Sequence, residues 1–245
     1  MSACPVDHGA QRGGGGCPVD HSGPDAAAKS GLNALNFMEP ADHTVDPKQK
    51  VPLSTHRVQS TIPMGSFVPQ HQTEGQQTWQ YPSEQQYFNA MKRKGWDPEE
   101  RDMKVIVSIH NTINEKGWSD VVAFERTLHP DAYGSDKCPE PKLVRFMGRP
   151  KDFSPKARFL NTIGVANLPF DRHDWIVDRN GTEVRYVIDF YSGQPVPGKP
   201  LSVYMDVRPA LDTVQNAVDR VRMQFHKSIL PLLPFRGMLW SDKKE

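Results

Sequence analysis

The chain contains 245 residues, carries a net charge of +1 and has three cysteines. This length allows one large domain or two small ones, and the near-neutral charge gives no bulk attraction to nucleic acid. Three cysteines are too few for a disulfide scaffold, and no apolar run approaches the roughly 18 residues of a membrane-spanning helix.

The N-terminus carries no recognisable targeting sequence. It has glycines where a secretory signal has an apolar core, and it lacks the Arg-rich amphipathic pattern of a mitochondrial presequence. Targeting signals alone therefore predict a cytosolic protein. Near the C-terminus, the apolar residues 229–235 are interrupted by two prolines, so they can touch a membrane surface but cannot cross it.

The first 78 residues are rich in Gly, Pro, Gln, Ser and Ala and contain few aromatic residues. Such a composition buries too little apolar surface to offset the chain entropy lost on folding. We therefore predict a mostly disordered arm over residues 1–78 and a folded domain over residues 79–245. Within the arm, residues 62–67 can pack against that domain as an extended segment.

The arm carries the unit Cys-Pro-Val-Asp-His twice, at residues 4–8 and 17–21, and the third cysteine, Cys138, also precedes a proline. Three chemistries remain open for the repeated unit. Its Cys and His side chains can bind Zn²⁺, although the spacing is a weak match. The thiols can form a disulfide in an oxidising compartment. Alternatively, Cys4 and Cys17 can each offer a thiolate to ferric haem.

Three helices are predicted after Trp79. The first begins with a capping box at residues 83–86 and ends at Gly95. The second begins at Asp97, with proline at its first helical position, and a third covers residues 118–128. In the second helix His110 shares the apolar face formed by its neighbours Met103, Ile106 and Ile113.

A histidine on an apolar helix face has two interpretations. It is either a core residue hydrogen-bonded to a neighbour or an axial ligand of haem iron, because neutral imidazole is the usual ligand and a porphyrin requires an apolar wall. If His110 binds haem, Trp118 can stack on the ring edge and Glu115 can anchor the adjoining loop.

A Pro-rich basic loop is predicted over residues 145–158. Its cations are either solvated or bind the two haem propionates, since Arg suits bidentate carboxylate binding. The candidates, which the sequence does not rank, are Arg145, Arg149, Lys151, Lys156 and Arg158.

A three-stranded antiparallel meander is predicted next, with strands at residues 174–179, 182–190 and 201–207. The intervening Asn180-Gly181 favours a two-residue type I′ turn because both positions need positive φ. That turn sets the register, pairing Val177 with Val184 and Trp175 with Tyr186.

A final helix is predicted from Pro209, and its apolar stripe is expected to pack on the sheet. The stripe consists of Leu211, Val214, Val218, Val221 and Phe225. The predicted fold class is therefore α+β, with helices, a small antiparallel sheet and a C-terminal covering helix.

A polar cluster at residues 171–174 precedes the first of these strands. It is either a structural salt-bridge network or the mouth of a pocket with Arg172 and His173 at its rim and Trp175 beneath. No phosphate-binding loop, dinucleotide turn or hydrolase motif occurs, and no cysteine lies near a predicted helix N-terminus that would activate it.

From about residue 79 to 225 the chain resembles the mitochondrial cytochrome c-type haem lyases, also called holocytochrome c synthases. The most specific strings are Pro-Phe-Asp-Arg-His-Asp-Trp at residues 169–175 and Asp-Val-Arg-Pro-Ala-Leu-Asp at residues 206–212. Segments 109–118, 145–158 and 181–189 also match, and the Cys-Pro-Val units resemble the family's haem-regulatory motifs.

The resemblance implies an enzyme that attaches haem b covalently to apocytochrome c or c1, through thioethers to the cysteines of a Cys-x-x-Cys-His motif. It places the enzyme in the mitochondrial intermembrane space, peripheral on the inner membrane, which replaces the cytosolic prediction. The family's haem-ligating histidine matches His110, its functional acid matches Glu115, and a second histidine and an arginine match His173 and Arg179.

Two other functions remain open at this point. One is a haem-binding regulatory protein without synthase activity that uses Cys4 and Cys17 as sensors, and the other is a zinc-dependent interaction module. A synthase needs no catalytic cysteine of its own, because the substrate supplies both thiols.

Overall fold

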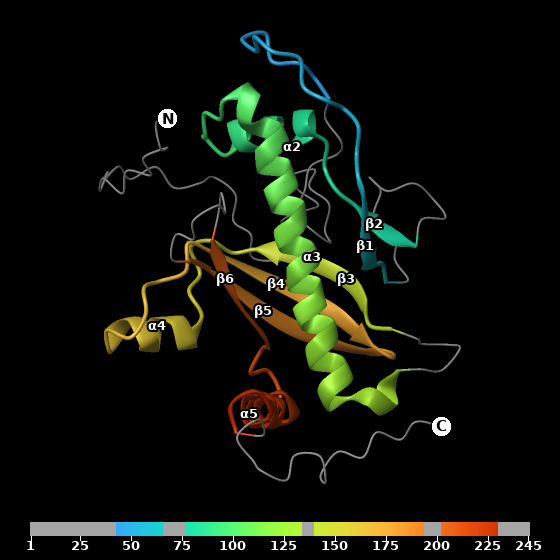
Figure 1. The fold of residues 1–245 in the computed structure, drawn as a ribbon, viewed down its shortest axis with the longest axis vertical. Helices are drawn as coiled ribbons and strands as arrows, with labels where there is room; N and C mark the ends of the chain where they lie inside the picture. Colours follow the sequence, from blue (N-terminus) through green and yellow to red (C-terminus); the bar gives the residue numbers. More distant parts are fainter. Residues whose placement is uncertain (1–42, 66–76, 134–139, 194–201, 230–245) are drawn as a thin grey trace.

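The computed structural model describes residues 43–65, 77–133, 140–193 and 202–229. They form a mixed α+β fold in which the long helix α3 (Met103–Leu128) lies across one face of a four-stranded antiparallel sheet (Figure 1). The sheet order is β3-β4-β5-β6, with strands at Lys142–Gly148, Asp171–Arg179, Thr182–Ser192 and Val203–Pro209.

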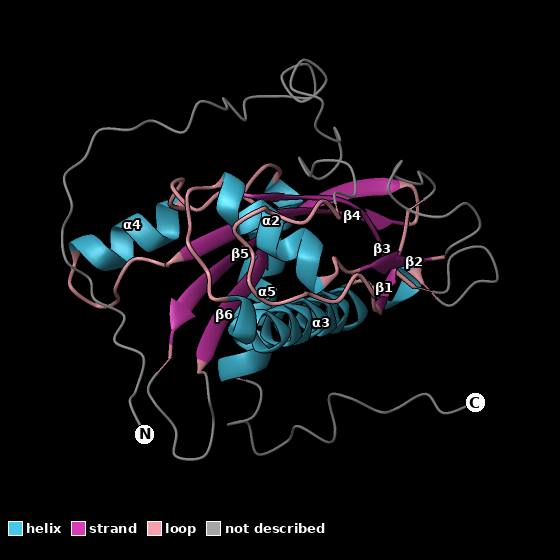
Figure 2. Cartoon of the chain, turned by 90° about the horizontal axis from the view of Figure 1, so that it is seen from above, coloured by secondary structure: helices cyan, strands magenta, loops and turns pink. Residues whose placement is uncertain are grey.

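The other helices surround this pair of layers. Helix α2 (Glu84–Arg93) packs on α3, α4 (Pro155–Thr162) projects at one end of the fold, and α5 (Val214–Ser228) contacts α3 and β6 (Figure 2). Single 3₁₀ turns, η1 (Glu100–Asp102) and η2 (Pro130–Ala132), flank α3. Within the described residues, no helix is both long and apolar enough to cross a membrane.

The residues before the predicted start at Trp79 contribute to the core. Strand β1 (Gln59–Pro63) pairs antiparallel with β2 (Thr78–Gln80), and Ile62 and Met64 are buried in the main hydrophobic cluster. The expectation that residues from 62 onward pack as an extended segment is thus confirmed up to residue 65. Residues 1–42, including both Cys-Pro-Val units, lie outside the described residues, so the disordered arm remains a prediction there.

The capping box of α2 is confirmed, because Ser83 and Gln86 exchange reciprocal hydrogen bonds with each other's backbone. The prediction of separate second and third helices is wrong, since α3 runs unbroken from Met103 to Leu128. Gly117, in the middle of α3, faces the sheet, and a Cβ there would lie 3.5 Å from the Trp175 ring, an ordinary van der Waals contact.

The predicted hairpin is confirmed in turn and register. Asn180 and Gly181 have φ of 47° and 87°, and Trp175 pairs with Tyr186. The three-stranded meander is correct for β4, β5 and β6 but incomplete, because β3 adds a fourth strand. The predicted basic loop over residues 145–158 is therefore too long at both ends. Residues 145–148 belong to β3, and α4 starts at Pro155.

The prediction for the final helix is wrong in start and orientation. Pro209 ends β6, and α5 begins at Val214 after the cap Thr213. Its apolar stripe faces outward, with Val214 83% and Val221 71% exposed, whereas Asn216, Asp219 and Met223 are buried. Buried Asp219 decides the orientation, because it accepts a hydrogen bond from His129 and lies 3.8 Å from Arg179, and both contacts would be lost if Asp219 faced outward.

Candidate functional site

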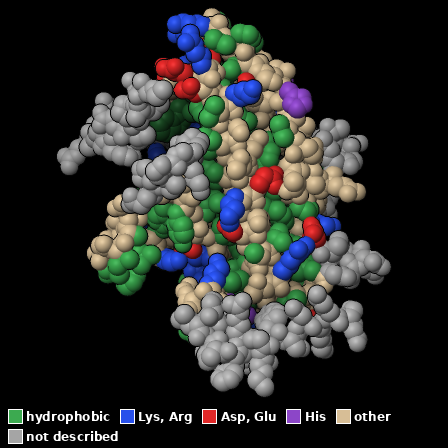
Figure 3. Space-filling view, in the orientation of Figure 1, with side chains coloured by type: hydrophobic (Ala, Val, Ile, Leu, Met, Phe, Trp, Pro, Cys, Tyr) green, Lys and Arg blue, Asp and Glu red, His purple; other side chains and the backbone are tan. Residues whose placement is uncertain are grey.

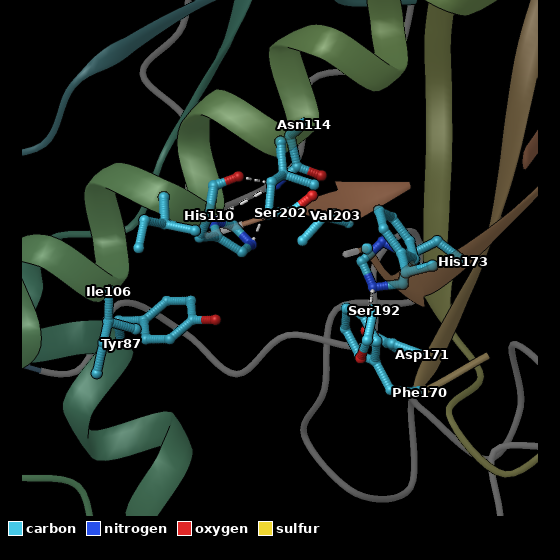
Figure 4. A pocket seen from close by; sticks show the side chains of 14 residues that line it. Tyr87, Ile106, His110, Asn114, Phe170, Asp171, His173, Ser192, Ser202 and Val203 are labelled. Atoms are coloured by element: carbon cyan, nitrogen blue, oxygen red, sulfur yellow. Dashed lines mark hydrogen bonds and ion pairs between the residues drawn. The ribbon is translucent and has the colours of Figure 1, made fainter. Parts of the chain in front are cut away.

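A cavity of about 560 Å³ opens between α3, α2 and one end of the sheet (Figure 4). Its volume lies in the usual range for small-molecule sites. The lining is mainly apolar with a few polar groups and comprises Tyr87, Ile106, Ile109, His110, Ile113, Asn114, Phe170, Asp171, His173, Phe190, Ser192, Gly193, Ser202 and Val203.

His110 lies in the α3 wall of this cavity, as its helical position predicts. The Tyr87 ring packs edge-on at 5.0 Å between centroids, and the Asn114 side-chain amide contacts the Nε2 atom of His110 at 3.1 Å. Burial lowers the pKa of His110 from 6.5 to about 4. The imidazole is therefore neutral at pH 7 and has a lone pair for a metal ion.

A second imidazole faces His110 from the opposite wall (Figure 4). Nε2 of His173 lies 3.2 Å from the carboxylate of Asp171, and Phe190 packs edge-on against the ring. Burial favours a higher pKa for Asp171, but the hydrogen bond and charge of His173 outweigh it and lower the pKa. Nδ1 of His173 is buried without a hydrogen-bond partner among the described residues.

Glu115 lies outside the cavity, on the side of α3 that faces β1. Its carboxylate accepts hydrogen bonds from Ser60 Oγ at 2.7 Å, Tyr81 Oη at 2.9 Å and the Thr61 amide at 3.1 Å, and Thr61 Oγ1 is a further donor. Burial opposes ionisation, but the hydrogen bonds from Thr61 and Ser60 lower the pKa of Glu115. These contacts attach β1 and the segment before α2 to α3.

Trp118 and Trp175 pack together in the main core, with ring centroids 6.4 Å apart. They are only 6% and 2% exposed, and neither lines the cavity. Their predicted contact with a cofactor has no counterpart in this geometry, and both residues instead join α3 to the sheet.

Arg179 lies toward the opposite end of α3 from His110. Its guanidinium makes two hydrogen bonds of 2.7 Å with Glu125 and approaches Asp219 at 3.8 Å. Tyr133 and Tyr186 also donate to Glu125, so the carboxylate is fully satisfied in the core. Arg179 thus connects β4, α3 and α5 at a site remote from the cavity.

The cations predicted to hold propionates do not line the cavity. Arg149 and Arg172 both pair with Asp174, Arg145 lies 3.9 Å from Glu183, and Lys156 pairs with Asp206. Lys151 and Arg158 are exposed. The charge of another cation, Lys94 after α2, acts on both His110 and Asp171.

The sequence indicated His110 and His173 but missed several cavity residues. Tyr87 falls within the first predicted helix but was not predicted to be a site residue, and the polar residues Ser192 and Ser202 gave no signal because they flank a segment between strands. No group of three or more His, Cys, Asp or Glu side chains in the described segments could hold a metal ion. Cys4 and Cys17 lie outside those segments.

The chain matches a family model described as cytochrome c/c1 heme lyase over residues 1–224. It is 46% identical over 195 residues to a putative holocytochrome-c1 synthase of Schizosaccharomyces pombe, covering 80% of this chain and 84% of the relative. It is 43% identical over 213 residues to the holocytochrome c-type synthase of Bos taurus, covering 84% and 71%. It is 36% identical over 246 residues to the holocytochrome-c synthase of Saccharomyces cerevisiae, covering 90% and 85%. No solved structure matches significantly. Because the family model covers residues 1–224 and these relatives are 36–46% identical, the chain belongs to the cytochrome c/c1 heme lyase family.

Proposed function

We propose that this chain attaches haem covalently to apocytochrome c or c1 by joining haem vinyl groups to cysteine thiols of the cytochrome. The family match supports the reaction. One structural observation supports the location of this reaction: the neutral imidazole of His110 lies in the wall of an apolar cavity, and the imidazole of His173 lies opposite. The regulatory alternative without synthase activity has no support, because the matched relatives are named as synthases.

In this proposal His110 binds the iron of haem b and the apolar side chains around it accept the porphyrin. Ile106, Ile109 and Ile113 give that wall its apolar character. Nε2 of His110 is contacted by the Asn114 amide, so iron ligation through Nε2 displaces that contact. The low pKa of His110 favours ligation, because no proton has to leave the ring at neutral pH.

Each thioether forms when a thiol adds across a vinyl group. The sulfur bonds to the inner vinyl carbon, the thiol hydrogen ends on the outer carbon, and the double bond becomes single, so no oxidant or reductant is consumed. The histidine of the substrate Cys-x-x-Cys-His motif takes the second axial position on iron. Both thiols then lie beside the vinyls, and orientation lowers the barrier by several kcal/mol.

The His173–Asp171 pair is placed to assist the proton transfer. The carboxylate of Asp171 fixes one ring nitrogen. The other nitrogen, Nδ1, has no hydrogen-bond partner among the described residues and can take the proton from the thiol and return it to the outer vinyl carbon. Lys94 does not line the cavity, but its charge acts on both His110 and Asp171, so it is the cation we assign to a propionate in this scheme. Glu115 and Arg179 act in this scheme by holding the elements that form the cavity.

We place this activity in the mitochondrial intermembrane space, at the surface of the inner membrane, as the family resemblance implies. In this proposal residues 79–245 form most of the catalytic domain, and residues 59–65 complete its core. The segment before it offers Cys4 and Cys17 as two thiolates that capture or sense haem, and residues 13–16 between them are all glycine.

Replacing His110 with alanine tests the proposal. We expect His110→Ala to lose the ligated haem spectrum and to reduce thioether formation on an apocytochrome peptide at least about 100-fold. The matched control is His56→Ala, which removes an exposed imidazole outside the cavity. A normal haem spectrum in His110→Ala would contradict the ligand assignment, and absence of thioether product with the wild-type chain would contradict the reaction.

A further inference from the structure

A second cavity, of about 430 Å³, lies on the face of the sheet opposite α3. Side chains alternate along a strand, so β5 directs Tyr186 and Ile188 into the core and Arg185 and Val187 to the other face. The N-terminal part of α4 and the segment before α5 complete the walls. This cavity shares no lining residue with the cavity of His110.

Five cations line the second cavity: Lys156, Arg172, Arg185, Arg208 and Arg220. Four of them are held by carboxylates around the walls. Asp174 accepts from Arg172 at 2.9 Å and from Arg185 at 2.8 Å, and Asp206 pairs with Lys156 at 2.6 Å. Asp189 pairs with Arg208, and Asp212 pairs with Arg185. The carboxylates thus fix these cations in position.

Arg220 has no carboxylate partner among the described residues. Its Nε donates to the Pro209 carbonyl at 2.6 Å, which leaves the rest of the guanidinium unpaired there. Burial and the nearby charge of Arg208 lower the pKa of Arg220 to about 10. Arg208 is only 5% exposed, and its Nε is buried without a hydrogen-bond partner among the described residues. Arg208 therefore has one unmet donor beside the cavity, and the terminal guanidinium nitrogens of Arg220 are not engaged by a described carboxylate.

The rim of the cavity is apolar. Phe159 of α4 and Leu211 before α5 line it while remaining 63% and 60% exposed to solvent. Figure 3 shows the α3 side of the molecule, where hydrophobic atoms also cover α4. A ligand that satisfies this site has an anionic group for the arginines and an apolar part for the rim.

We propose that this cavity binds the phosphate group of a phosphate ester whose apolar part rests on Phe159 and Leu211. Guanidinium donors from β6 and α5 approach from different elements, which suits a tetrahedral oxyanion better than a planar carboxylate with two oxygens. The volume exceeds that needed for inorganic phosphate alone and lies in the range of small-molecule sites. The source of the phosphate is either a phospholipid headgroup or a soluble ester.

Two binding arms distinguish the sources, both with the full chain and without haem. In one arm, the chain is sedimented with phosphatidylcholine vesicles that contain or lack phosphatidylglycerol. In the other, glycerol 3-phosphate is titrated by calorimetry. Binding only to the phosphatidylglycerol vesicles identifies a headgroup site, and calorimetric binding identifies a site for soluble esters. The proposal is overturned if neither probe binds.

The decisive variant is Arg220→Gln, whose amide can still donate to the Pro209 carbonyl. We expect it to weaken binding of the positive probe roughly tenfold. Arg222→Gln is the control, because it removes an exposed cation of the same helix that does not line the cavity. Should Arg220→Gln fail to fold, Lys156→Gln replaces it, and equal binding by the cavity variant and the control overturns the proposal. The haem spectrum should be unchanged in both, so the result is independent of the function proposed for His110.

Discussion

His110 is kept ready for ligation by its immediate surroundings. It lies among isoleucines on one face of α3, with Tyr87 against its ring and Asn114 against Nε2. Burial makes the charged form costly, so the side chain stays neutral far below the pH at which an exposed histidine gains a proton. The lowered pKa of His110 therefore affects both haem binding and the pH dependence of fold stability.

This linkage predicts that the fold becomes less stable in acid through His110. Between pH 6.5 and about 4 the unfolded chain binds a proton at this residue and the folded chain does not. The free energy of unfolding should therefore fall as the pH decreases through this window, by up to about 3 kcal/mol, and change no further below it on account of His110.

Urea unfolding above, within and below the window measures the effect, compared with His110→Gln. The wild type should lose more stability than the variant across the window. His56→Gln, which removes an exposed imidazole, should behave like the wild type. If wild type and His110→Gln show the same pH dependence, the pKa of His110 is not depressed.

At the scale of elements, Glu115 attaches the β1–β2 pair to α3. Its carboxylate faces donors from Ser60, Thr61 and Tyr81, none of which lines the cavity. An acid in this position acts on the reaction through the placement of α3 and of Tyr81, whose ring packs edge-on against His110 with centroids 6.1 Å apart. Loss of the hydrogen bonds to Glu115 is therefore expected to lower the stability of the fold without changing haem ligation by His110.

Glu115→Gln should destabilise the fold by about 1–3 kcal/mol, because an amide cannot accept all of these hydrogen bonds. Asp120→Asn, on the same helix, should cost less than about 1 kcal/mol, since its ion pair with Lys116 is at the surface. Urea unfolding gives both values. Below the unfolding transition the haem spectrum of Glu115→Gln should match the wild type, and an altered spectrum at unchanged stability would place Glu115 in the haem site instead.

At the scale of the whole molecule, Arg179 joins three elements that are distant in sequence. It pairs with Glu125 of α3, approaches Asp219 of α5 and belongs to β4. Glu125 and Asp219 are both fully buried, so each depends on the cations and donors around it. The far end of α3 is therefore held by charge pairing in addition to the buried side chains of Val121, Phe124 and Leu128, while the end near His110 is held by apolar contacts.

Arg179→Gln should lower the free energy of unfolding by about 3–5 kcal/mol, because it leaves the Glu125 carboxylate buried without its cation. Arg126→Gln, which removes the exposed neighbour paired with Glu140, should have little effect. Adding Glu125→Gln to Arg179→Gln should recover part of the loss, and chemical denaturation of the four chains completes the cycle. A fully stable Arg179→Gln that lacks synthase activity would show that Arg179 acts in the chemistry.

Local features of the fold were predictable from sequence because they depend on neighbouring residues. The capping box at Ser83, the turn at Asn180-Gly181 and the register of β4 with β5 follow from hydrogen bonds and φ preferences within a few positions. The apolar environment of His110 followed from helical spacing, which depends only on residues one turn away.

Other features depended on contacts between distant segments. Residues 145–148 of the predicted basic loop belong to strand β3 because β4 offers an edge to pair with. Helix α5 turns its apolar stripe outward because Asp219 is bound by His129 and Arg179. The sequence by itself thus determined the haem-lyase family, the local turns and the histidine in an apolar helix face. Only the tertiary structure decided which side chains meet across the two cavities, because burial and ion pairing are properties of segments brought together by folding.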